Sequence, residues 1–218
     1  MTAVWIPRSA DALVQAIAEG TVAHEAAAYE YKRELPSPRD NKSIAVDVAA
    51  MATAGGIIIY GVAEDKKAAT LSAEPIALAG AKDRISDVVS SQVSEPPYFE
   101  VNLLPLATDS SMGYVVVDVP ASPRAPHMVE VKGEYRFYGR MPGGNFMLTE
   151  SQVAHLYERR ERTEREAMRA LDEAIGPLRS HRPTAAEIST SSSTRSYPTT
   201  GSESASCPTV TRLPSTTQ

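Results

Sequence analysis

Two stretches of the sequence contain acidic and basic side chains that could act together on a phosphate group. The first contains Glu25, Glu30 and Lys32, and the second, which follows an apolar run, contains Glu64 and Asp65. Carboxylate oxygens suit hard divalent cations, and a neighbouring lysine can neutralise a phosphate oxygen while a metal-bound water attacks phosphorus. These residue types predict a metal or proton-transfer site, with Mg²⁺ or Mn²⁺ as the metal.

The spacing of the first group sets a geometric condition on this site. On a regular strand Glu30 and Lys32 share a face, whereas Glu25, five residues before Glu30, points to the opposite face. The two glutamates converge only if Glu25 lies in the turn before the strand or if a bulge intervenes. The alternative interpretation is that these residues are ordinary solvated charges at strand ends.

Caps, turn residues and apolar periodicity predict the elements that position these side chains. Helices are predicted over 10–19, from residue 41 or 43 to 51, over 82–93, and from 149 past 169. Strands are predicted over 29–32, 57–62, 98–104, 113–119, 127–131 and 134–138. Because most neighbouring strands can pair as hairpins, we expect an α+β fold with a mixed sheet and helices packed on it.

The composition changes abruptly near Gly176, and this change sets the predicted domain boundaries. Of the 39 residues from Ser180 to the end, 19 are Ser or Thr, which predicts a disordered C-terminal tail. A phosphorylated or partner-binding tail is the functional alternative. The predicted parts are an N-terminal helical segment (1–21), a central domain (22–148), a C-terminal helix (149–176) and the tail (177–218).

Composition also excludes several classes of protein. The net charge is −5, which argues against a surface that coats nucleic acid by bulk positive charge, so any bound anion must meet a local patch. The single cysteine, Cys207, excludes an internal disulfide framework and a cysteine zinc cluster. No secretory signal, membrane-length apolar run or phosphate-binding P-loop is readable, so we expect a cytoplasmic protein without an ATP site or membrane partner.

Several short motifs occur together in one order along the chain. They are Glu25-x4-Glu30-x-Lys32, Ala-Met-Ala-Thr-Ala-Gly-Gly, Ile-Ile-Ile-Tyr-Gly-Val-Ala-Glu-Asp, Pro96-Pro97 and Tyr-Arg-Phe-Tyr-Gly-Arg140. In this order they resemble the Schlafen AlbA-like domain, and the resemblance covers residues 22–160. Bacterial members of that family are described as DNA-binding or helix-turn-helix regulators. The resemblance therefore implies a bacterial protein that binds nucleic acid, DNA or RNA.

The resemblance also implies a set of catalytic residues. Animal Schlafen relatives contain a metal-dependent endoribonuclease that cuts transfer and ribosomal RNA with two glutamates and an aspartate. The matching glutamates are Glu25 and Glu30, and Lys32 matches the lysine that follows. The third acid is Glu64 in a gapless match and Asp65 after a shift of one residue.

Two departures from the family pattern bear on this activity. Thr53 and Ala54 stand where family members commonly have Asn and Gly. The animal nucleases also use paired domains, whereas this chain has one copy, so a homodimer would have to supply the second half.

The predicted nucleic-acid contacts are basic residues near these motifs. They are Lys32, Arg33, Lys42, Arg124, Lys132, Arg136 and Arg140. Tyr135, Phe137 and Tyr138 alternate with two of these arginines and could stack on an unpaired base, although a hairpin with core-packing aromatics is the alternative. His127 could touch phosphate or assist acid–base chemistry, and otherwise is an ordinary solvated loop histidine.

The last predicted helix is rich in compensating charge. Between Glu158 and Arg169 there are five arginines and four glutamates, a pattern typical of a solvated, ion-paired helix face. Apolar residues along the same helix could instead form a dimer seam.

Three functions remain as hypotheses. The leading one is nucleic-acid binding through a basic groove beside an acidic pocket. The second is a Mg²⁺- or Mn²⁺-dependent endoribonuclease acting on structured RNA such as transfer RNA. The third is a protein-interaction module, supported by the acidic net charge and the tail.

Overall fold

The computed structural model describes residues 5–22, 28–65, 67–131 and 133–180. Glu25 and Lys132, both predicted to be functional, lie outside these ranges, and so does the predicted tail from residue 181 onward. The chain divides after Ala170 into two compact units. The three sheets and the candidate sites belong to the first unit. No described helix is long and apolar enough to cross a membrane.

Helices form where caps and apolar spacing predict them. The helices are α1 (Ala10–Ala18), a 3₁₀ turn η1 (Pro38–Asp40), α2 (Lys42–Met51), α3 (Ala81–Gln92) and α4 (Glu150–Ser180). The predicted cap of α1 is present, since Ser9 Oγ accepts a hydrogen bond from the backbone N–H of Ala12 at 3.2 Å. Helix α4 runs four residues beyond the predicted end at Gly176.

The described strands form three sheets. The first contains β1 (Tyr29–Lys32), β2 (Gly56–Tyr60), β5 (Ile76–Ala77), β7 (Glu100–Pro105) and β8 (Met112–Val119). The second contains β6 (Val93–Ser94), β9 (Met128–Val131), β10 (Glu134–Met141) and β11 (Gly144–Met147). The third is the hairpin of β3 (Val62–Asp65) and β4 (Thr70–Ala73). Because β1 and β2 are parallel and the other pairs are antiparallel, the first sheet is mixed, which confirms the predicted α+β class.

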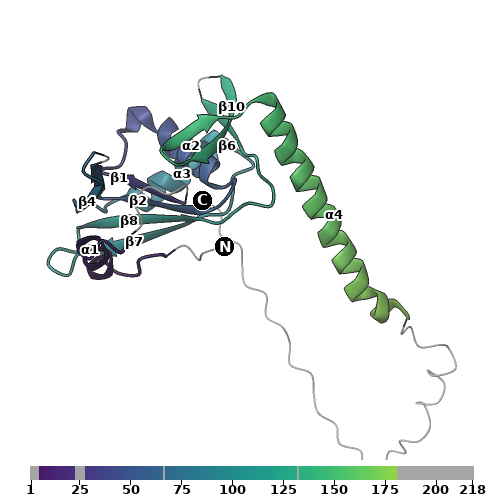
Figure 1. Cartoon of the computed structure of the whole chain (residues 1–218), viewed down its shortest axis with the longest axis horizontal. Helices are drawn as coiled ribbons and strands as arrows, with labels where there is room; N and C mark the ends of the chain where they lie inside the picture. The colour runs from purple at the N-terminus through teal and green to yellow at the C-terminus, as the bar shows by residue number, and fades with distance from the viewer. Residues whose placement is uncertain (1–4, 23–27, 66, 132, 181–218) are drawn as a thin grey trace, which may run out of the picture. The chain divides into compact units, whose positions relative to one another are not determined.

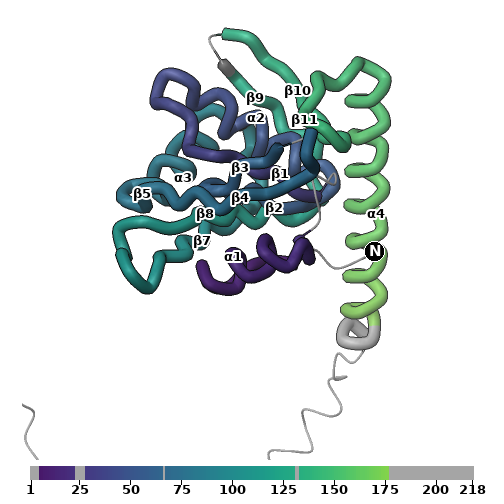
Figure 2. Tube along the Cα trace, turned by 60° about the vertical axis from the view of Figure 1, so that its left-hand side comes forward, coloured from purple at the N-terminus to yellow at the C-terminus, as the bar shows by residue number. Residues whose placement is uncertain are grey.

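Helices cover both faces of the first sheet. Helices α2 and α3 lie on one face, where Ile58 and Tyr60 of β2 pack against Ile44 and Ile85. Helix α1 lies on the opposite face, where Leu13 belongs to a separate buried cluster (Figures 1 and 2). The uniformly buried strand β2 runs between these two cores, as its uninterrupted apolar sequence requires.

The second sheet packs on the side of α2 that faces away from the first sheet. Its strands β9, β10 and β11 all contact α2, so this helix lies between the two sheets (Figure 1). Helix α2 is accordingly buried along nearly its whole length, from Ile44 to Met51. Side chains from both sheets can therefore meet around this one helix.

The observed strands differ from the predicted ones at Gly61 and in several short segments. The strand predicted over 57–62 is split at Gly61, which has a φ of +95° and separates β2 from the hairpin β3–β4. A β-carbon at Gly61 would lie 2.8 Å from the Tyr114 ring, so glycine is also required by space. Five short strands were not predicted, because segments of two to four residues carry little periodicity: β4, β5, β6, β11 and, apart from Val62, β3.

Candidate functional site

Strand β1 and helix α2 direct three charged side chains toward each other. Glu30 and Lys32 are two residues apart on β1, and their register partners on β2 are Ile58 and Tyr60, which face α2. Both β1 side chains therefore point to α2 as well. There they meet Asp47, which is 4% exposed in the middle of that helix.

Lys32 joins the two carboxylates. Its Nζ lies 2.8 Å from Glu30 Oε1 and 3.3 Å from Asp47 Oδ2. The amino group thus stands between an acid from the sheet and an acid from the helix.

Two side chains of the second sheet contact the same two carboxylates. Arg140 of β10 and Asn145 of β11 are register partners, and Arg140 Nη1 donates to Asn145 Oδ1 at 3.2 Å. Arg140 also forms an ion pair with Glu30, and Asn145 Nδ2 donates to Asp47 Oδ1 at 2.6 Å. We call these five residues the ionic cluster: Glu30, Lys32, Asp47, Arg140 and Asn145.

Exposure differs sharply within the ionic cluster. The side chains of Glu30, Asp47 and Arg140 are 3–9% exposed, whereas that of Lys32 is 31% exposed. Two acids and two bases balance in formal charge, which is the condition under which buried ions are tolerated. Lys32 is therefore the charged member of the cluster that solvent reaches most readily.

Burial and neighbouring charge shift two pKa values in the cluster. Burial raises the pKa of Asp47 to about 6, although Lys32 beside it acts in the opposite direction. Burial alone would lower the pKa of Lys32, but Asp47 and Glu30 more than offset this effect and raise it. The lysine therefore stays protonated, and Asp47 is a carboxyl group able to exchange a proton near neutral pH.

Tyr60 is a further buried polar group close to the cluster. Its hydroxyl is fully buried and has no hydrogen-bond partner among the described residues. Burial, together with the charges of Asp47 and Glu30, raises its pKa strongly, so the phenol stays neutral.

The cluster fits a divalent cation only if Lys32 moves. Two carboxylates face one point, but the Lys32 ammonium already occupies the space between them. In the part of the chain that the structure describes, no group of three acidic, histidine or cysteine side chains could hold a metal ion. Since Glu25 lies outside that part, the three-acid metal site stays a prediction.

The candidates for the third acid lie in a different hollow. Glu64 and Asp65 line a depression of about 500 Å³ together with Arg33, whereas neither Glu30 nor Lys32 lines it. Asp65 is exposed, and its Oδ1 accepts hydrogen bonds from the backbone N–H groups of residues 67 and 68 at 2.9 and 3.1 Å. That carboxylate therefore caps the β3–β4 turn in this structure.

The predicted basic contacts occupy different surroundings. Arg33 pairs with Glu74 at 3.3 Å, and Arg124 pairs with Glu95 at 2.9 Å. Arg140 is buried in the ionic cluster, and Lys132 lies outside the described residues. Arg136 Nε lies 4.0 Å from Glu134 Oε2 on the same strand, and Lys42 lines a polar cleft.

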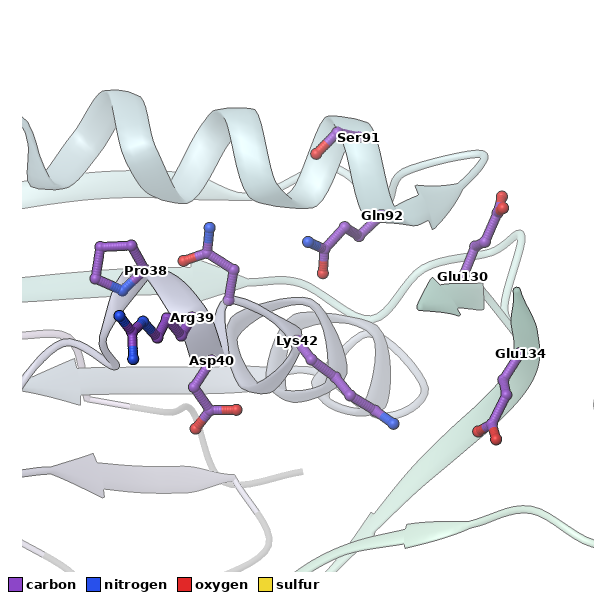
Figure 3. A pocket seen from close by; sticks show the side chains of 9 residues that line it. Pro38, Arg39, Asp40, Lys42, Ser91, Gln92, Glu130 and Glu134 are labelled. Atoms are coloured by element: carbon purple, nitrogen blue, oxygen red, sulfur yellow. The ribbon is translucent and has the colours of Figure 1, made fainter. Parts of the chain in front are cut away.

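A polar cleft of about 590 Å³ lies where α2 begins, between the end of α3 and the hairpin β9–β10 (Figure 3). Its lining residues are Pro38, Arg39, Asp40, Asn41, Lys42, Ser91, Gln92, Glu130 and Glu134. Figure 3 shows the Lys42 side chain extending toward the strands that carry Glu130 and Glu134. Arg136, two residues after Glu134 on β10, is not among these lining residues.

The predicted stacking aromatics divide between core and surface. Phe137 packs edge-on against Tyr157 of α4, with ring centroids 6.2 Å apart, and Tyr138 packs against the main core. Tyr135, at 56% exposed, is the one of the three that presents its ring to solvent.

Sequence reasoning missed Asp47, Asn145 and Tyr60 as site residues. Asp47 did carry a signal, since it is the only charged side chain within the apolar run from Ile44 to Met51. A single charged side chain on the buried face of a helix needs an oppositely charged or hydrogen-bonding partner, because its burial alone costs free energy. Asn145 carried no comparable signal, because its contact with Asp47 spans 98 residues.

Comparison with known proteins identifies the family of the chain. The family model described as Schlafen, AlbA_2 matches residues 25–149. No curated protein matches the chain. Among solved structures, the DIP2311 protein from Corynebacterium diphtheriae is similar, with 18% sequence identity and a TM-score of 0.41. That match covers 67% of this chain and 28% of the solved one, so it spans less than a third of the solved chain.

Proposed function

The chain belongs to the Schlafen AlbA_2 family, and on that premise we propose that it binds an unpaired stretch of nucleic acid in the cleft at the start of α2. The observation that carries this proposal is the position of Arg39 and Lys42 beside the unpartnered acceptor Gln92 in one cleft. The volume of about 590 Å³ lies within the range of known ligand sites.

The cationic part of the cleft suits phosphate. Arg39 and Lys42 flank the beginning of α2, and the first turn of this helix contains no acidic residue. The positive end of the helix dipole therefore adds to the two side chains. Phosphate contacts of this kind fix the position of a strand without reading its sequence.

The acceptors in the cleft suit base edges. Gln92 Oε1 is buried and has no hydrogen-bond partner among the described residues, and Glu130 and Glu134 line the opposite wall. Exocyclic amino groups of bases donate to such oxygens, and they are accessible where bases are unpaired. Tyr135, exposed on the same hairpin, can stack on a base.

The charge balance of the cleft sets the expected strength of binding. Arg39 and Lys42 face Asp40, Glu130 and Glu134, so the cleft is not a strongly positive surface. We therefore expect moderate affinity and a clear preference for single strands over duplex, because an unpaired base can turn its amino group into the cleft, whereas a paired base offers it only within a groove.

The test compares single-stranded and duplex oligonucleotides of equal length by fluorescence anisotropy. Lys42→Glu is expected to weaken single-strand binding roughly tenfold, since one charge-assisted contact is replaced by repulsion. The matched control is Lys82→Glu, because Lys82 is exposed at the other end of α3, about 15 Å from Gln92 along the helix. Equal loss in both variants, or no binding by the wild type, contradicts the proposal.

A metal-dependent ribonuclease is the second candidate. It is favoured by the convergence of Glu30, Asp47 and Lys32, two carboxylates and one cation that solvent reaches from the lysine side. Within that group Lys32 is suited to pair with a phosphate oxygen, and Asp47 is suited to exchange a proton. Arg140 and Asn145 hold the two acids in place.

The nuclease is tested by incubating transfer RNA with the protein and Mn²⁺. Glu30→Gln and Asp47→Asn are expected to abolish cleavage, whereas Asp87→Asn, at an exposed position on α3, is expected to retain it. Thermal melting of each variant separates lost activity from lost folding. Cleavage that persists in both cluster variants contradicts this candidate.

A further inference from the structure

A second group of reactive side chains lies around His127, in a cleft whose lining includes no residue of the ionic cluster. Sequence analysis left open an ordinary solvated histidine, but the structure buries it to 3% exposure. It forms one wall of a cleft of about 440 Å³, together with Ser122 and Arg124. Neither the proposed nucleic-acid cleft nor the ionic cluster uses this histidine.

The hydrogen bonds of His127 determine which of its nitrogens is a base. Nδ1 lies 2.7 Å from the backbone carbonyl oxygen of Glu95, and Nε2 lies 2.8 Å from Ser122 Oγ. A carbonyl oxygen only accepts, so Nδ1 carries the proton. Nε2 is then the acceptor, and the Ser122 hydroxyl donates to it. This is the arrangement of a serine nucleophile, a general base and a third group that orients the base.

The orienting residue Glu95 has an unusual backbone. Its φ is +49°, in the left-handed region that non-glycine residues seldom adopt. This conformation belongs to the residue whose carbonyl oxygen accepts from His127. Strain of this kind persists where surrounding contacts enforce it, and it concentrates at functional sites.

Charges around His127 favour its neutral form. Burial lowers the pKa of His127, and the nearby Arg160 and Arg124 act in the same direction, against the contacts with Glu95. A neutral imidazole is the form that can accept the serine proton. Both arginines are paired with the Glu95 carboxylate, since Arg124 Nη2 lies 2.9 Å and Arg160 Nη2 lies 3.5 Å from its Oε2.

The walls of the cleft indicate the substrate class. Apart from Glu95, Ser122, Arg124 and His127, they consist of the apolar or aromatic residues Pro96, Pro97, Tyr98, Pro120, Ala121 and Pro123. Ser122 is half-buried in this wall, and its Oγ also accepts from the backbone N–H of Arg124 at 3.2 Å. An apolar wall next to a positioned hydroxyl fits the acyl part of a small carboxylic ester.

We propose that Ser122 is a nucleophile activated by His127, and that this cleft transfers the acyl group of a small carboxylic ester to water. Ser122 Oγ attacks the ester carbonyl carbon while its proton moves to His127 Nε2. The carbon–oxygen bond to the alcohol breaks, and that oxygen takes the proton from Nε2. Water, deprotonated by the same nitrogen, then attacks the acyl carbon. The bond between this carbon and Ser122 Oγ breaks, the acid leaves, and Oγ takes the proton back from Nε2, so that atoms and charge balance.

The primary experiment labels the full chain with a fluorophosphonate and identifies the modified serine by peptide mapping. We expect Ser122 to react at least a hundredfold faster than Ser111, an exposed serine whose hydroxyl donates to Asp109 rather than to a histidine. Hydrolysis of p-nitrophenyl acetate is expected to be lost in Ser122→Ala and retained in Ser111→Ala. No labelling at Ser122, or equal labelling of both serines, overturns the proposal.

A second variant separates chemistry from structure. In His127→Asn the side-chain amide can still donate to the carbonyl of Glu95, but the base at Nε2 is removed. Labelling of Ser122 is expected to fall at least a hundredfold while the melting temperature changes little. Unchanged labelling overturns the role of the histidine.

Should His127→Asn fail to fold, Ser122→Cys replaces it. Iodoacetamide is then expected to alkylate this thiol at least tenfold faster than the thiol of Ser111→Cys, because the histidine favours the thiolate. Equal rates overturn the proposal.

Discussion

Asn145 Nδ2 donates a hydrogen bond of 2.6 Å to Asp47 Oδ1, which joins the second sheet to the helix that lies between the sheets. The same asparagine accepts from Arg140, whose guanidinium pairs with Glu30 on the first sheet. One neutral side chain thus links both halves of the ionic cluster. We conclude that the ionic cluster connects the first sheet, helix α2 and the second sheet, in addition to being a candidate site.

Loss of the hydrogen bond between Asn145 and Asp47 should destabilise the fold. Asn145→Ala leaves Asp47 Oδ1 buried without its donor, and we expect a loss of about 1–3 kcal/mol in the free energy of unfolding. Chemical denaturation measures this loss. The control is Asn102→Ala on β7, an exposed asparagine, for which we expect a change within about 0.5 kcal/mol. Equal effects of the two changes would show that the Asp47 contact contributes nothing.

Asp47 should give the stability an uncommon pH dependence. Its pKa is about 6 in the folded state and near 3.8 when unfolded, so the folded state binds more protons between these values. The free energy of unfolding of wild type minus that of Asp47→Asn should therefore fall as pH rises from about 4 to about 6. The expected total is on the order of 2–3 kcal/mol, with little change above pH 6.

Urea denaturation at several pH values measures this difference. An ordinary ion-paired aspartate, whose pKa is lowered on folding, gives the opposite slope. A difference that rises with pH would therefore show that Lys32, rather than burial, dominates the titration of Asp47.

The connection after α2 should depend on glycine for two separate reasons. Gly55 has a φ of +85°, and a β-carbon there would lie 2.8 Å from the backbone nitrogen of Ala121. Gly20 has a similar φ of +63° but open space around it. We expect Gly20→Ala to destabilise by about 1 kcal/mol and Gly55→Ala by about 2–4 kcal/mol, measured by denaturation. Equal losses would mean that the close approach to Ala121 is readily relieved.

Much of the first sheet and its helices could be predicted from sequence. Strand β1 has the predicted bounds, and α1, α2 and α3 differ from theirs by one or two residues at most, because caps and apolar periodicity act locally. The split at Gly61 was missed, since a glycine inside an apolar run does not reveal its φ. The order of these helices and strands along the chain was sufficient to predict the α+β class.

The site was predictable only in part. Glu30 and Lys32 were correctly placed on one strand face, because strand alternation is a local rule. Their partners Asp47, Arg140 and Asn145 come from three other elements, and the contacts depend on how two sheets pack on α2. Local rules do not specify such packing, so Arg140 was predicted as a surface cation although it is a buried one.

The most direct measurement of nucleic-acid binding is its salt dependence, followed by fluorescence anisotropy with a labelled single strand from about 50 to about 300 mM salt. We predict that the logarithm of the association constant falls linearly with the logarithm of salt concentration, with a slope near −0.7 per phosphate contact. Lys42→Gln should make that slope shallower by about 0.7, and Lys82→Gln should leave it unchanged. Binding that is insensitive to salt, or slopes that are identical in all three proteins, would contradict recognition of nucleic acid by this cleft.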